Sequence, residues 1–528
     1  MHHEIEIILG LLLVVAALVV VAQRLAVPYP ILLVIGGLIL GFIPGLPHVE
    51  LDPELVFALF LPPLLTSAAW YTSWRDFRFN LRPILLLAIG LVLVTTSAVA
   101  AVAHVAIEGV TWATGFVLGA IVSPPDAVAA TAITQRLHVP RRVVTVLEGE
   151  SLINDATGLV AYRFAVAAVT TGMFSLGEAS LRFFVMAIGG VLIGLAMGWI
   201  VVKIHSLMDD SLVEITTAIL MCFLAYLLAE RLGVSGVLAV VTSGLYYRRR
   251  SPEVLSPTTR IQTIAVWDII VFLLNGLIFI LIGLQLPTIL QEISEYSIAT
   301  LIWYGILVSA VVIAVRLLWV YPAAYIPRLL SRKLRDRDPY PSWQVLLLIG
   351  WAGMRGVVSL AAALALPLAT SNGTAFPNRD LIIFLTFCVI LVTLVLQGLT
   401  LPLLISWLKI VDDSNIEREE MEGRLRAAEA ALDRLDELLA QGCSQAEAEM
   451  IQWLRTLYSD RIRRISACCV AIDRGSKEQL VAFRQLQHEM VIAERRTAIK
   501  LRNQGAINDE VLHRIERDLD LEEARLGK

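Results

Sequence analysis

Charged residues are scarce over roughly the first three-quarters of this 528-residue chain. Residues 1–408 hold 46 Asp, Glu, Lys and Arg side chains, whereas the last 120 residues hold 44. Together with 57% hydrophobic residues and a mean hydropathy of +0.73, this shortage excludes an ordinary soluble protein. We expect a polytopic membrane domain over residues 1–408 and a soluble domain over residues 409–528.

Cysteine is scarce as well, and the five cysteines show neither zinc-ligand spacing nor a disulfide framework. They are Cys222, Cys388, Cys443, Cys468 and Cys469. The net charge of −4 and the lack of a basic stripe interleaved with aromatic residues argue against a nucleic-acid partner. The N-terminal sequence lacks the basic region of a signal peptide, so we expect the first apolar run to be retained. No cofactor is predicted.

Apolar runs long enough to cross a bilayer as helices, about 17–25 residues, recur along residues 1–408. We predict thirteen transmembrane helices, at about residues 5–22, 29–43, 53–72, 82–105, 112–135, 147–171, 183–204, 212–230, 234–247, 262–285, 299–327, 343–368 and 381–408. The predicted fold class is therefore an all-α polytopic membrane protein. Because thirteen is odd, the two termini are expected on opposite sides of the membrane.

Basic residues in the connecting loops predict which side each terminus faces. Alternate loops carry seventeen Lys and Arg residues, and the intervening loops carry only three, which are Arg182, Arg231 and Arg379. Since cytoplasmic loops are enriched in basic residues, this bias places the N-terminus outside and residues 409–528 in the cytoplasm.

Residues 409–528 are polar, and part of their apolar pattern is helical. Apolar residues recur at alternating intervals of three and four at Leu425, Ala428, Leu432, Leu435 and Leu439. The pattern covers barely two heptads, which is too short to predict a coiled coil. We expect a cytoplasmic helical domain that regulates the membrane domain.

Inside the predicted spans, ionisable residues are few and gather in three segments. The segment EGESLINDATG contains Glu150 and Asp155, the segment SPPDAVAATAI contains Asp126, and the segment GMRGVVSLAAALALP contains Arg355. Charged groups are costly in a membrane and usually mark an ion path or a proton relay. These residues therefore predict a transporter of small cations or protons.

The depth of these residues can be estimated from the rise of 1.5 Å per helical residue. Counted from the predicted entry of each span, Asp126, Asp155 and Arg355 lie about 21, 12 and 18 Å into a hydrocarbon core of roughly 30 Å. All three fall in the middle third of the bilayer, where a transporter site is expected.

Two of these spans are expected to be broken at that depth. Ser123-Pro124-Pro125 precedes Asp126, and each proline removes a backbone donor and disfavours helix at the residue before it. Around Arg355, three glycines (Gly350, Gly353 and Gly356) predict a second break, although glycine is a weaker signal for one than proline. Broken helices at the midplane are typical of transporters built on inverted repeats, and the predicted directions of the two groups of spans are compatible with such a repeat.

The predicted cation ligands are oxygen atoms of four kinds. Ser151 and Asp155 are four residues apart on one helix face, and Asn154 lies beside them. With Asp126 and the backbone carbonyl of Pro125, they offer carboxylate, hydroxyl, amide and carbonyl oxygens, which suit a hard cation such as sodium. A carboxyl group that is buried beside another can also hold a proton near neutral pH. Asp155 and Asp126 are therefore the candidate carriers of cation and proton.

Glu150 is the expected partner of Arg355, because a charge left unpaired at that depth is expensive. The other ionisable residues within the spans are interpreted as structural or interfacial. They are His104, Arg163, Glu214, Asp268 and Arg316.

Two other functions fit part of this pattern. Two intramembrane aspartates also define an aspartyl protease, but that enzyme requires Tyr-Asp on one helix and Gly-x-Gly-Asp on the next. Here Asp126 follows Pro125 and Asp155 follows Asn154, so an enzyme is not expected. A channel is the second alternative, and saturable, proton-linked flux would distinguish a transporter from it.

Three passages resemble the cation:proton antiporter family 1, in particular its bacterial sodium/proton exchangers. They are LPPLLTSAAWYTSWRDFR at 61–78, SPPDAVAATAI at 123–133 with EGESLINDATGLV at 148–160, and WAGMRGVVSLA at 351–361. The resemblance covers nearly the whole predicted membrane region, and the Asn-Asp pair within the second passage is its most specific feature.

The resemblance implies a homodimer in the plasma membrane that works by alternating access, with a mobile core domain moving against a dimerisation domain. It implies that Asp155 carries ion and proton in turn, with Asp126 and Ser151 nearby, and that Glu150 and Arg355 form a structural ion pair. Asn-Asp resembles the electroneutral branch, so one monovalent cation (sodium, potassium or lithium) is expected to exchange for one proton. The implied role is pH and sodium homeostasis.

The sequence departs from the family at two places. Relatives often place a carboxylate shortly after LPPLL, where this chain has Thr66 and Ser67, and many have a threonine where this chain has Pro125. Both departures concern residues that bear on the ligand set and on the choice between sodium and potassium.

Overall fold

The computed structural model describes residues 2–526 except 26, 44–52, 138, 173–175, 209, 294–295, 372, 411–414, 442–444, 474–476, 505 and 507. The described residues form helices and connecting turns, and their only β contact is an isolated bridge between Ala369 and Ala375. The predicted all-α fold is confirmed. The chain divides into two units, Met1–Asp412 and Asp413–Lys528, which are described separately.

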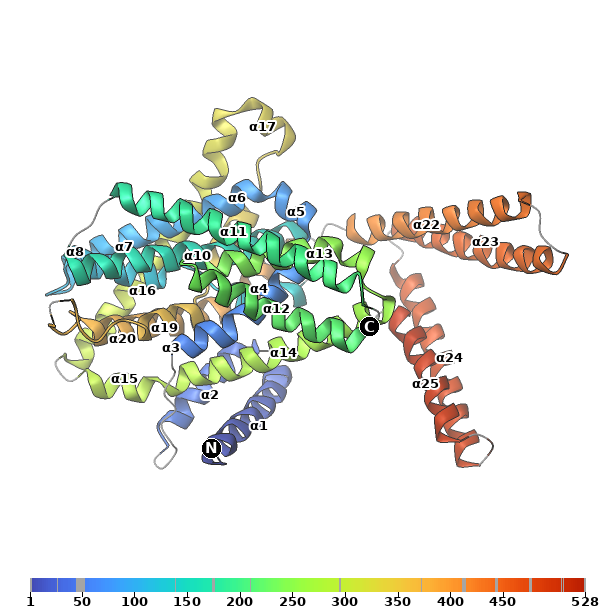
Figure 1. Ribbon diagram of the computed structural model, residues 1–528, viewed down its shortest axis with the longest axis horizontal. Helices are drawn as coiled ribbons and strands as arrows, with labels where there is room; N and C mark the ends of the chain where they lie inside the picture. The colour runs from blue at the N-terminus through green and yellow to red at the C-terminus, as the bar shows by residue number, and fades with distance from the viewer. Residues whose placement is uncertain are drawn as a thin grey trace. The chain divides into compact units, whose positions relative to one another are not determined.

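The predicted spans coincide with helices of the first unit (Figure 1). Eight correspond to single helices: α1 (His2–Leu25), α2 (Tyr29–Gly41), α10 (Arg141–Thr171), α11 (Leu176–His205), α12 (Ser211–Arg231), α13 (Gly236–Val254), α14 (Pro257–Leu284) and α16 (Ile298–Leu330). Within the described residues, seven apolar helical segments are long enough to cross a membrane on their own. Four more apolar helices are shorter, so the total of thirteen crossings stays a prediction.

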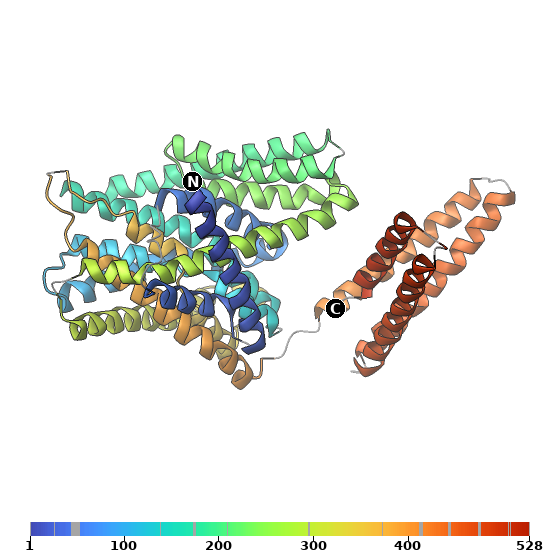
Figure 2. The same ribbon diagram turned by 90° about the horizontal axis from the view of Figure 1, so that it is seen from below.

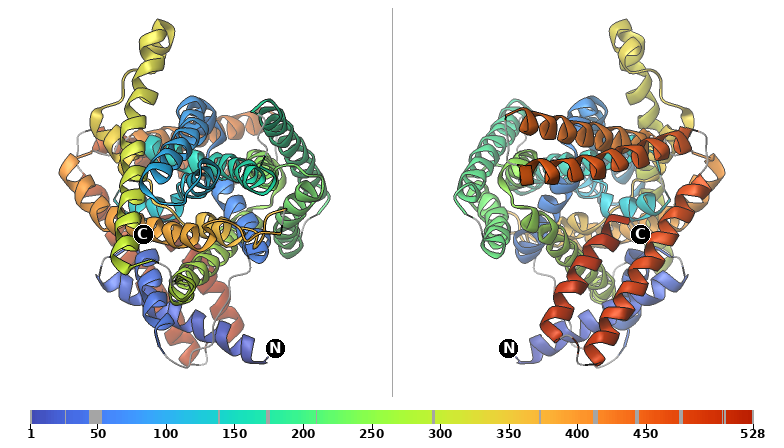
Figure 3. Two further views of the ribbon diagram at one scale, coloured as in Figure 1. Left: turned by 90° about the vertical axis from the view of Figure 1, so that its left-hand side faces the viewer. Right: turned by 90° about the vertical axis from the view of Figure 1, so that its right-hand side faces the viewer.

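The other five spans consist of consecutive shorter helices. Three contain a π-helical turn: α3 (Pro53–Leu55) with η1 (Val56–Phe60) and α4 (Leu61–Tyr71), α6 (Leu81–Leu85) with η2 (Leu86–Leu91) and α7 (Val92–Ala106), and α20 (Arg379–Val392) with η3 (Thr393–Gln397) and α21 (Gly398–Leu408). Two are interrupted: α8 (Trp112–Val122) with α9 (Ala127–Arg136), and α18 (Trp343–Trp351) with α19 (Val357–Leu364). Short helices α5 (Trp74–Phe79), α15 (Leu286–Glu292) and α17 (Arg332–Arg337) connect spans, and α17 projects from the bundle (Figures 1 and 3).

Polar side chains fix where many helices of this unit begin. Five serines accept a hydrogen bond from the backbone N–H three residues further on, at Ser73, Ser235, Ser256, Ser297 and Ser342. Thr111 and Thr114 form a capping box at the start of α8. Each such cap stabilises a helix by about 1 kcal/mol, because the first turn leaves backbone donors without an intrahelical partner.

The two interrupted helices are joined to each other at their interruptions. The backbone N–H of Asp126 donates to the carbonyl oxygen of Met354 at 2.7 Å, and Nε of Arg355 donates to the carbonyl oxygen of Val122 at 3.1 Å. A Cβ atom at Gly356 would overlap the Asp126 carboxylate, so the approach requires glycine there. The predicted breaks, before Asp126 and around Arg355, are confirmed, and they form one crossing.

Glycine also brings the backbones of α2 and α14 into contact. A Cβ atom at Gly37 would overlap the carbonyl oxygen of Ile280, and one at Gly283 would overlap that of Val34. Small residues allow helices to approach this closely within a membrane. The position of α14 against α2 is therefore fixed by backbone contacts.

Helix α10 runs lengthwise through the bundle and contacts α8, α13 and α18, among others (Figure 1). Its Glu150 forms a bidentate ion pair with Arg316 of α16, with Nη1–Oε1 at 2.5 Å and Nη2–Oε2 at 2.8 Å. Arg316 also donates to the carbonyl oxygen of Ile349 in α18. Both side chains of the pair are at most 1% exposed, so this interaction ties three helices together inside the bundle.

The predicted pairing of Glu150 with Arg355 is therefore wrong. Arg355 is fully buried, but it donates to carbonyl oxygens that the helix breaks leave free, those of Val122 and Gly353. The guanidinium of Arg316 passes so close to Gly353 that a Cβ atom there would overlap it. The partner of Glu150 is therefore Arg316 of α16. The interpretation of Arg316 as a structural residue is confirmed.

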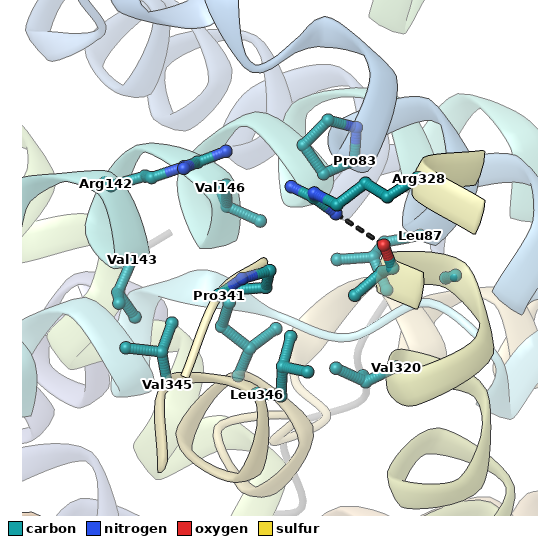
Figure 4. A pocket seen from close by; sticks show the side chains of 13 residues that line it. Pro83, Leu87, Arg142, Val143, Val146, Val320, Arg328, Pro341, Val345 and Leu346 are labelled. Atoms are coloured by element: carbon teal, nitrogen blue, oxygen red, sulfur yellow. Dashed lines mark hydrogen bonds between the residues drawn. The ribbon is translucent and has the colours of Figure 1, made fainter. Parts of the chain in front are cut away.

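A second charged cluster lies where α6, α10 and α16 come together. Asp338 accepts hydrogen bonds from Arg82 at 3.3 Å, Arg142 at 2.8 Å and Arg328 at 2.6 Å. Figure 4 shows Arg142 and Arg328 at one edge of an otherwise largely apolar cavity of about 60 Å³. One carboxylate therefore holds together three cations that would otherwise repel one another.

The second unit contains the helices α22 (Asn415–Ala440), α23 (Gln445–Asp473), α24 (Lys477–Asn503) and α25 (Asp509–Leu526). Figure 2 shows them as two pairs, α22 with α23 and α24 with α25, and α23 also contacts α24. Ala428 of α22, Val491 and Ala498 of α24, and Leu512 of α25 are buried in this unit. The predicted helical character of residues 409–528 is confirmed where the structure describes them.

We predict that Asp338→Asn lowers the free energy of unfolding by about 2–4 kcal/mol. Removing one partner of a buried ion pair costs about 3–5 kcal/mol, and the partial exposure of Arg82 and Arg142 reduces that figure. Thermal unfolding of the purified protein in detergent measures the change. The matched control is Asp336→Asn, an exposed neighbour, and equal unfolding temperatures of the two variants would contradict the role of Asp338.

Glu150 and Arg316 are expected to behave as a coupled pair. Glu150→Gln and Arg316→Met should each cost about 3–5 kcal/mol, because each leaves a buried charge without its partner, and the double variant should cost clearly less than the sum. The exposed pair of Arg163 and Glu230, at 2.7 Å, is the control and should contribute below about 1 kcal/mol. Strictly additive losses in the Glu150–Arg316 cycle would refute the coupling.

Candidate functional site

Helix α10 presents most of the predicted site residues. Asn154 is fully buried, Asp155 is 6% exposed, and Ser151 lies one turn before Asp155. The segment is a regular helix through these polar residues, whereas the segment it faces is not helical at Pro124 and Pro125. The polar side chains of α10 therefore point from a regular helix toward an irregular backbone.

Asp126 is held at the crossing by two backbone hydrogen bonds. It is the N-cap of α9, where its Oδ1 accepts from the backbone N–H of Val128 at 2.8 Å. Its own N–H donates to Met354 of the other interrupted helix. These contacts fix the carboxylate at the start of α9, where the helix dipole favours a negative charge.

Asn154 connects α10 to the first break. Its Nδ2 donates to the carbonyl oxygen of Pro125 at 3.0 Å. Its Oδ1 is buried and finds no hydrogen-bond partner among the described residues. Asn154 thus uses its amide group to position the Pro125 carbonyl, and it is not among the residues that line the cavity described next.

A cavity of about 70 Å³ lies at the crossing. Four predicted site residues line it together, which are Pro125, Asp126, Ser151 and Asp155. The facing wall is apolar and comes mainly from η1 and α4, with Phe57, Phe60, Leu61, Leu64, Leu65 and Ala68. A cavity of this size has room for a cation and a few waters.

Two polar residues of this cavity were not predicted from the sequence. Asn275 of α14 and Ser359 of α19 both line it, and each is 2% exposed. Each is a polar side chain inside a strongly apolar helix, which is the signal that could have found them. Asn275 brings a second amide to the site from a helix that follows α10 by about a hundred residues.

Arg355 supplies positive charge beside this site. Its backbone N–H donates to Oγ1 of Thr393 at 3.1 Å, and its guanidinium donates to Val122 and Gly353. Its Nη2 is buried without a hydrogen-bond partner among the described residues. The guanidinium is therefore held by the two helix breaks, and among the described residues it forms no ion pair with Asp126 or Asp155.

The donor set determines the ligand class that this cavity can hold. Two carboxylates, hydroxyl groups, an amide and the Pro125 carbonyl are hard oxygen ligands, which suit alkali cations and protons. Among the described residues, no group of three or more His, Cys, Asp and Glu side chains is arranged to hold a metal ion. The geometry thus fits a small cation that is bound reversibly beside an apolar wall.

Comparison with known proteins identifies the family. Residues 10–407 match the family described as sodium/hydrogen exchanger, transmembrane. An uncharacterised Na(+)/H(+) exchanger of Mycobacterium tuberculosis is 37% identical to this chain, over 99% of this chain and 97% of its own length. The sodium, potassium, lithium and rubidium/H(+) antiporter of Bacillus subtilis is 36% identical, over 76% of this chain and 61% of its own length.

A solved structure shares the fold. The sodium proton antiporter MjNhaP1 from Methanocaldococcus jannaschii superposes with a TM-score of 0.62 at 21% identity, covering 77% of this chain and 99% of that chain. The match over most of the first unit, together with the identity to full-length relatives, is sufficient to assign the chain. It belongs to the sodium/hydrogen exchanger family of transmembrane antiporters.

Proposed function

We propose that this antiporter exchanges one sodium ion for one proton, with Asp155 as the group that carries each in turn. Asp126, Ser151, Asn275, Ser359 and the Pro125 carbonyl complete the oxygen environment. The observation that carries the proposal is that Asp155 and Asp126 face one cavity at the crossing of two interrupted helices. Broken helices meeting at a cavity supply both ligands and half-helix ends to a transported ion.

Burial of Asp155 accounts for the coupling between the two fluxes. A bare carboxylate in this enclosed position is costly, whereas a carboxylate that holds a sodium ion or a proton is neutral. When Asp155 holds neither a sodium ion nor a proton, it is charged. In that state the site is therefore least able to pass from facing one side of the membrane to facing the other. Sodium can cross in one direction only if a proton returns.

Asn154 supports an electroneutral cycle. It is an amide where a second acid would stand beside Asp155, and it is occupied by its hydrogen bond to Pro125. Asp155 is then the one group on this stretch of α10 that changes its charge. If Asp126 keeps one protonation state, each turnover moves one cation against one proton, and the rate does not depend on the membrane potential.

Sodium is the proposed main substrate, and potassium and lithium are further candidates. The Bacillus subtilis relative is named for sodium, potassium, lithium and rubidium, which supports a site that selects for charge and oxygen coordination. The proposed setting is a homodimer in the plasma membrane, with the N-terminus outside and the second unit in the cytoplasm. The basic loops support this orientation, and the proposed role is pH and sodium homeostasis.

Asp155→Asn is expected to abolish sodium-driven proton movement while the protein still folds, because asparagine keeps the shape and has no proton to exchange. Asp126→Asn should impair exchange strongly as well. The measurement uses purified protein in proteoliposomes with a pH-sensitive dye, tested against sodium, potassium and lithium. Asp380→Asn, an acid at the start of α20 outside the cavity, is the control and should exchange like the original protein.

The same assay tests whether sodium and proton compete for one site. Because cation binding requires the deprotonated ligand, the apparent KM for sodium should rise by up to about tenfold for each unit that the pH falls. Near-normal exchange by Asp155→Asn would contradict the proposed carrier, and a KM that does not depend on pH would contradict a shared site.

The second unit is proposed to tune transport, since every candidate ligand lies in the first unit. Cutting the chain after Ser414 should leave exchange measurable, with a shifted dependence on pH or cation concentration. Exchange in proteoliposomes, compared at several pH values with the full chain, measures the effect. Complete loss of exchange by a correctly folded truncation would contradict a purely regulatory role.

A further inference from the structure

A second, much larger cavity lies between α10 and α11, with η2, α7 and α8 forming its other walls. Its volume is about 800 Å³, more than ten times that of the ion cavity. The two cavities share no lining residue. The proposed exchange of sodium for protons makes no use of this space.

The cavity between α10 and α11 is lined mainly by apolar side chains. Its floor is α10, where the small side chains of Ala161, Ala165 and Ala168 leave room. Aromatic rings bound it elsewhere, among them Trp112 of α8 and Phe184 of α11. An apolar cavity of this kind does not fill with water, and its volume is in the range of sites that bind sizeable apolar ligands.

Several of its walls are exposed on the surface of the first unit. Leu93 and Trp112 are each 52% exposed, and Phe184 is 60% exposed. Leu93 and Phe184 belong to two of the helical segments long enough to cross a membrane, Leu81–Ala106 and Ser180–His205. Large apolar side chains exposed on such segments face hydrocarbon, so the cavity is open to the bilayer.

The length of the cavity matches one leaflet. Along α10 it extends from Ala168 to Thr157, eleven residues or about 16 Å, and the hydrocarbon core of one leaflet is about 15 Å thick. Trp112 and Ser180, near the starts of α8 and α11, line its outer end. Tryptophan is enriched at the membrane interface. The cavity therefore extends from the interface toward the midplane, on the side that the basic loops predict to be outside.

The width of the cavity distinguishes between an acyl chain and a helix of a second copy. A volume of about 800 Å³ over about 16 Å gives a mean cross-section of about 50 Å². A helix with its side chains is at least about 10 Å across, which corresponds to about 80 Å². The space is too narrow for a helix, whereas flexible hydrocarbon chains can follow it.

The inner end of the cavity lies close to the ion site. Thr157, which lines it, follows Asp155 by two residues on α10. Thr96, which also lines it, donates a hydrogen bond from its Oγ1 to Oγ of Ser123 at 3.3 Å. Ser123 directly precedes the two prolines of the first break. A molecule in this cavity therefore packs against both elements that carry the site aspartates.

We propose that this cavity is a phospholipid site, in which the acyl region of a lipid from the outer leaflet lies between α10 and α11. The headgroup stays at the interface near Trp112 and Ser180, and the chain extends inward to Thr96 and Thr157. This goes beyond the proposed function and does not depend on which residue carries the ion.

Photolabelling from inside the cavity tests the proposal. Phe164, a half-buried residue of the cavity, is replaced by p-azidophenylalanine, which keeps its shape. The full chain is illuminated in vesicles of phosphatidylethanolamine and phosphatidylglycerol and its intact mass is measured. We expect a gain of one phospholipid mass. The same replacement at Leu192, which is exposed on α11, should also label lipid, and at Phe387, which is buried inside the bundle, it should not.

Filling the cavity separates bound lipid from bulk lipid. Ala161→Phe with Ala168→Phe should lower the lipid adduct at position 164 about tenfold, because the added rings exclude several buried methylene groups. Ala314→Phe adds a ring at an exposed position of α16 outside the cavity and should leave the adduct unchanged. All variants are compared as folded protein that exchanges sodium for protons like the original chain.

Three results would overturn the lipid site. The first is the absence of a lipid adduct at position 164 while position 192 is labelled. The second is an adduct at position 164 that persists undiminished in the filled variant, since it would report bulk lipid. The third is an adduct with the mass of two chains, which would show that a second copy of the protein occupies the cavity.

Discussion

The pair of hydrogen bonds between the two interrupted helices is the interaction on which the ion site depends. Asp126 donates its N–H to Met354, and Arg355 donates to Val122, so each break satisfies a backbone group that the other leaves free. An unpaired backbone group inside a membrane is costly, and irregular backbone persists there only where it finds such partners or lines a cavity. The cavity of the ion site lies at this crossing, beside the two breaks.

The buried charged side chains around the crossing also need partners, and their pairing decides which of them remain available to an ion. Glu150 and Arg316 neutralise each other, and neither of them lines the cavity. Arg355 donates to two carbonyl oxygens, and among the described residues no hydrogen bond or ion pair joins it to Asp126 or Asp155. Asp126 and Asp155 therefore remain available for an ion that binds reversibly.

Features that depend on residues close together in the sequence could be predicted, and features that depend on tertiary packing could not. The break before Asp126 is a covalent property of two adjacent prolines, and the shared face of Ser151 and Asp155 follows from the helical repeat, so both were predictable. The partner of Glu150 depends on which of two buried arginines the packing of α16 brings close, and spacing along the chain does not contain that information.

Two residues of the cavity were not predicted for the same reason, which is that their position depends on tertiary packing. Asn275 and Ser359 come from helices distant in sequence from α10, and each reads locally as a single polar residue in an apolar helix. Only the contact of α14 and α19 with the crossing distinguishes them from polar residues elsewhere in the bundle. Asp155 and Asp126 could be predicted both from the cost of a carboxylate at that depth and from the family resemblance, whereas the facing wall of the cavity depends on the fold.

The glycine contacts between α2 and α14 bear on how the bundle deforms. At Gly37 and Gly283 backbone lies against backbone, with no side chain between them that could change its rotamer, so this interface is stiff. At the cavity, α4 and α14 instead meet the crossing through leucine, phenylalanine and asparagine side chains around open space, and that interface is soft. Any deformation of the bundle that keeps these backbone contacts therefore moves α2 and α14 together, and through Asn275 of α14 it changes the wall of the ion site.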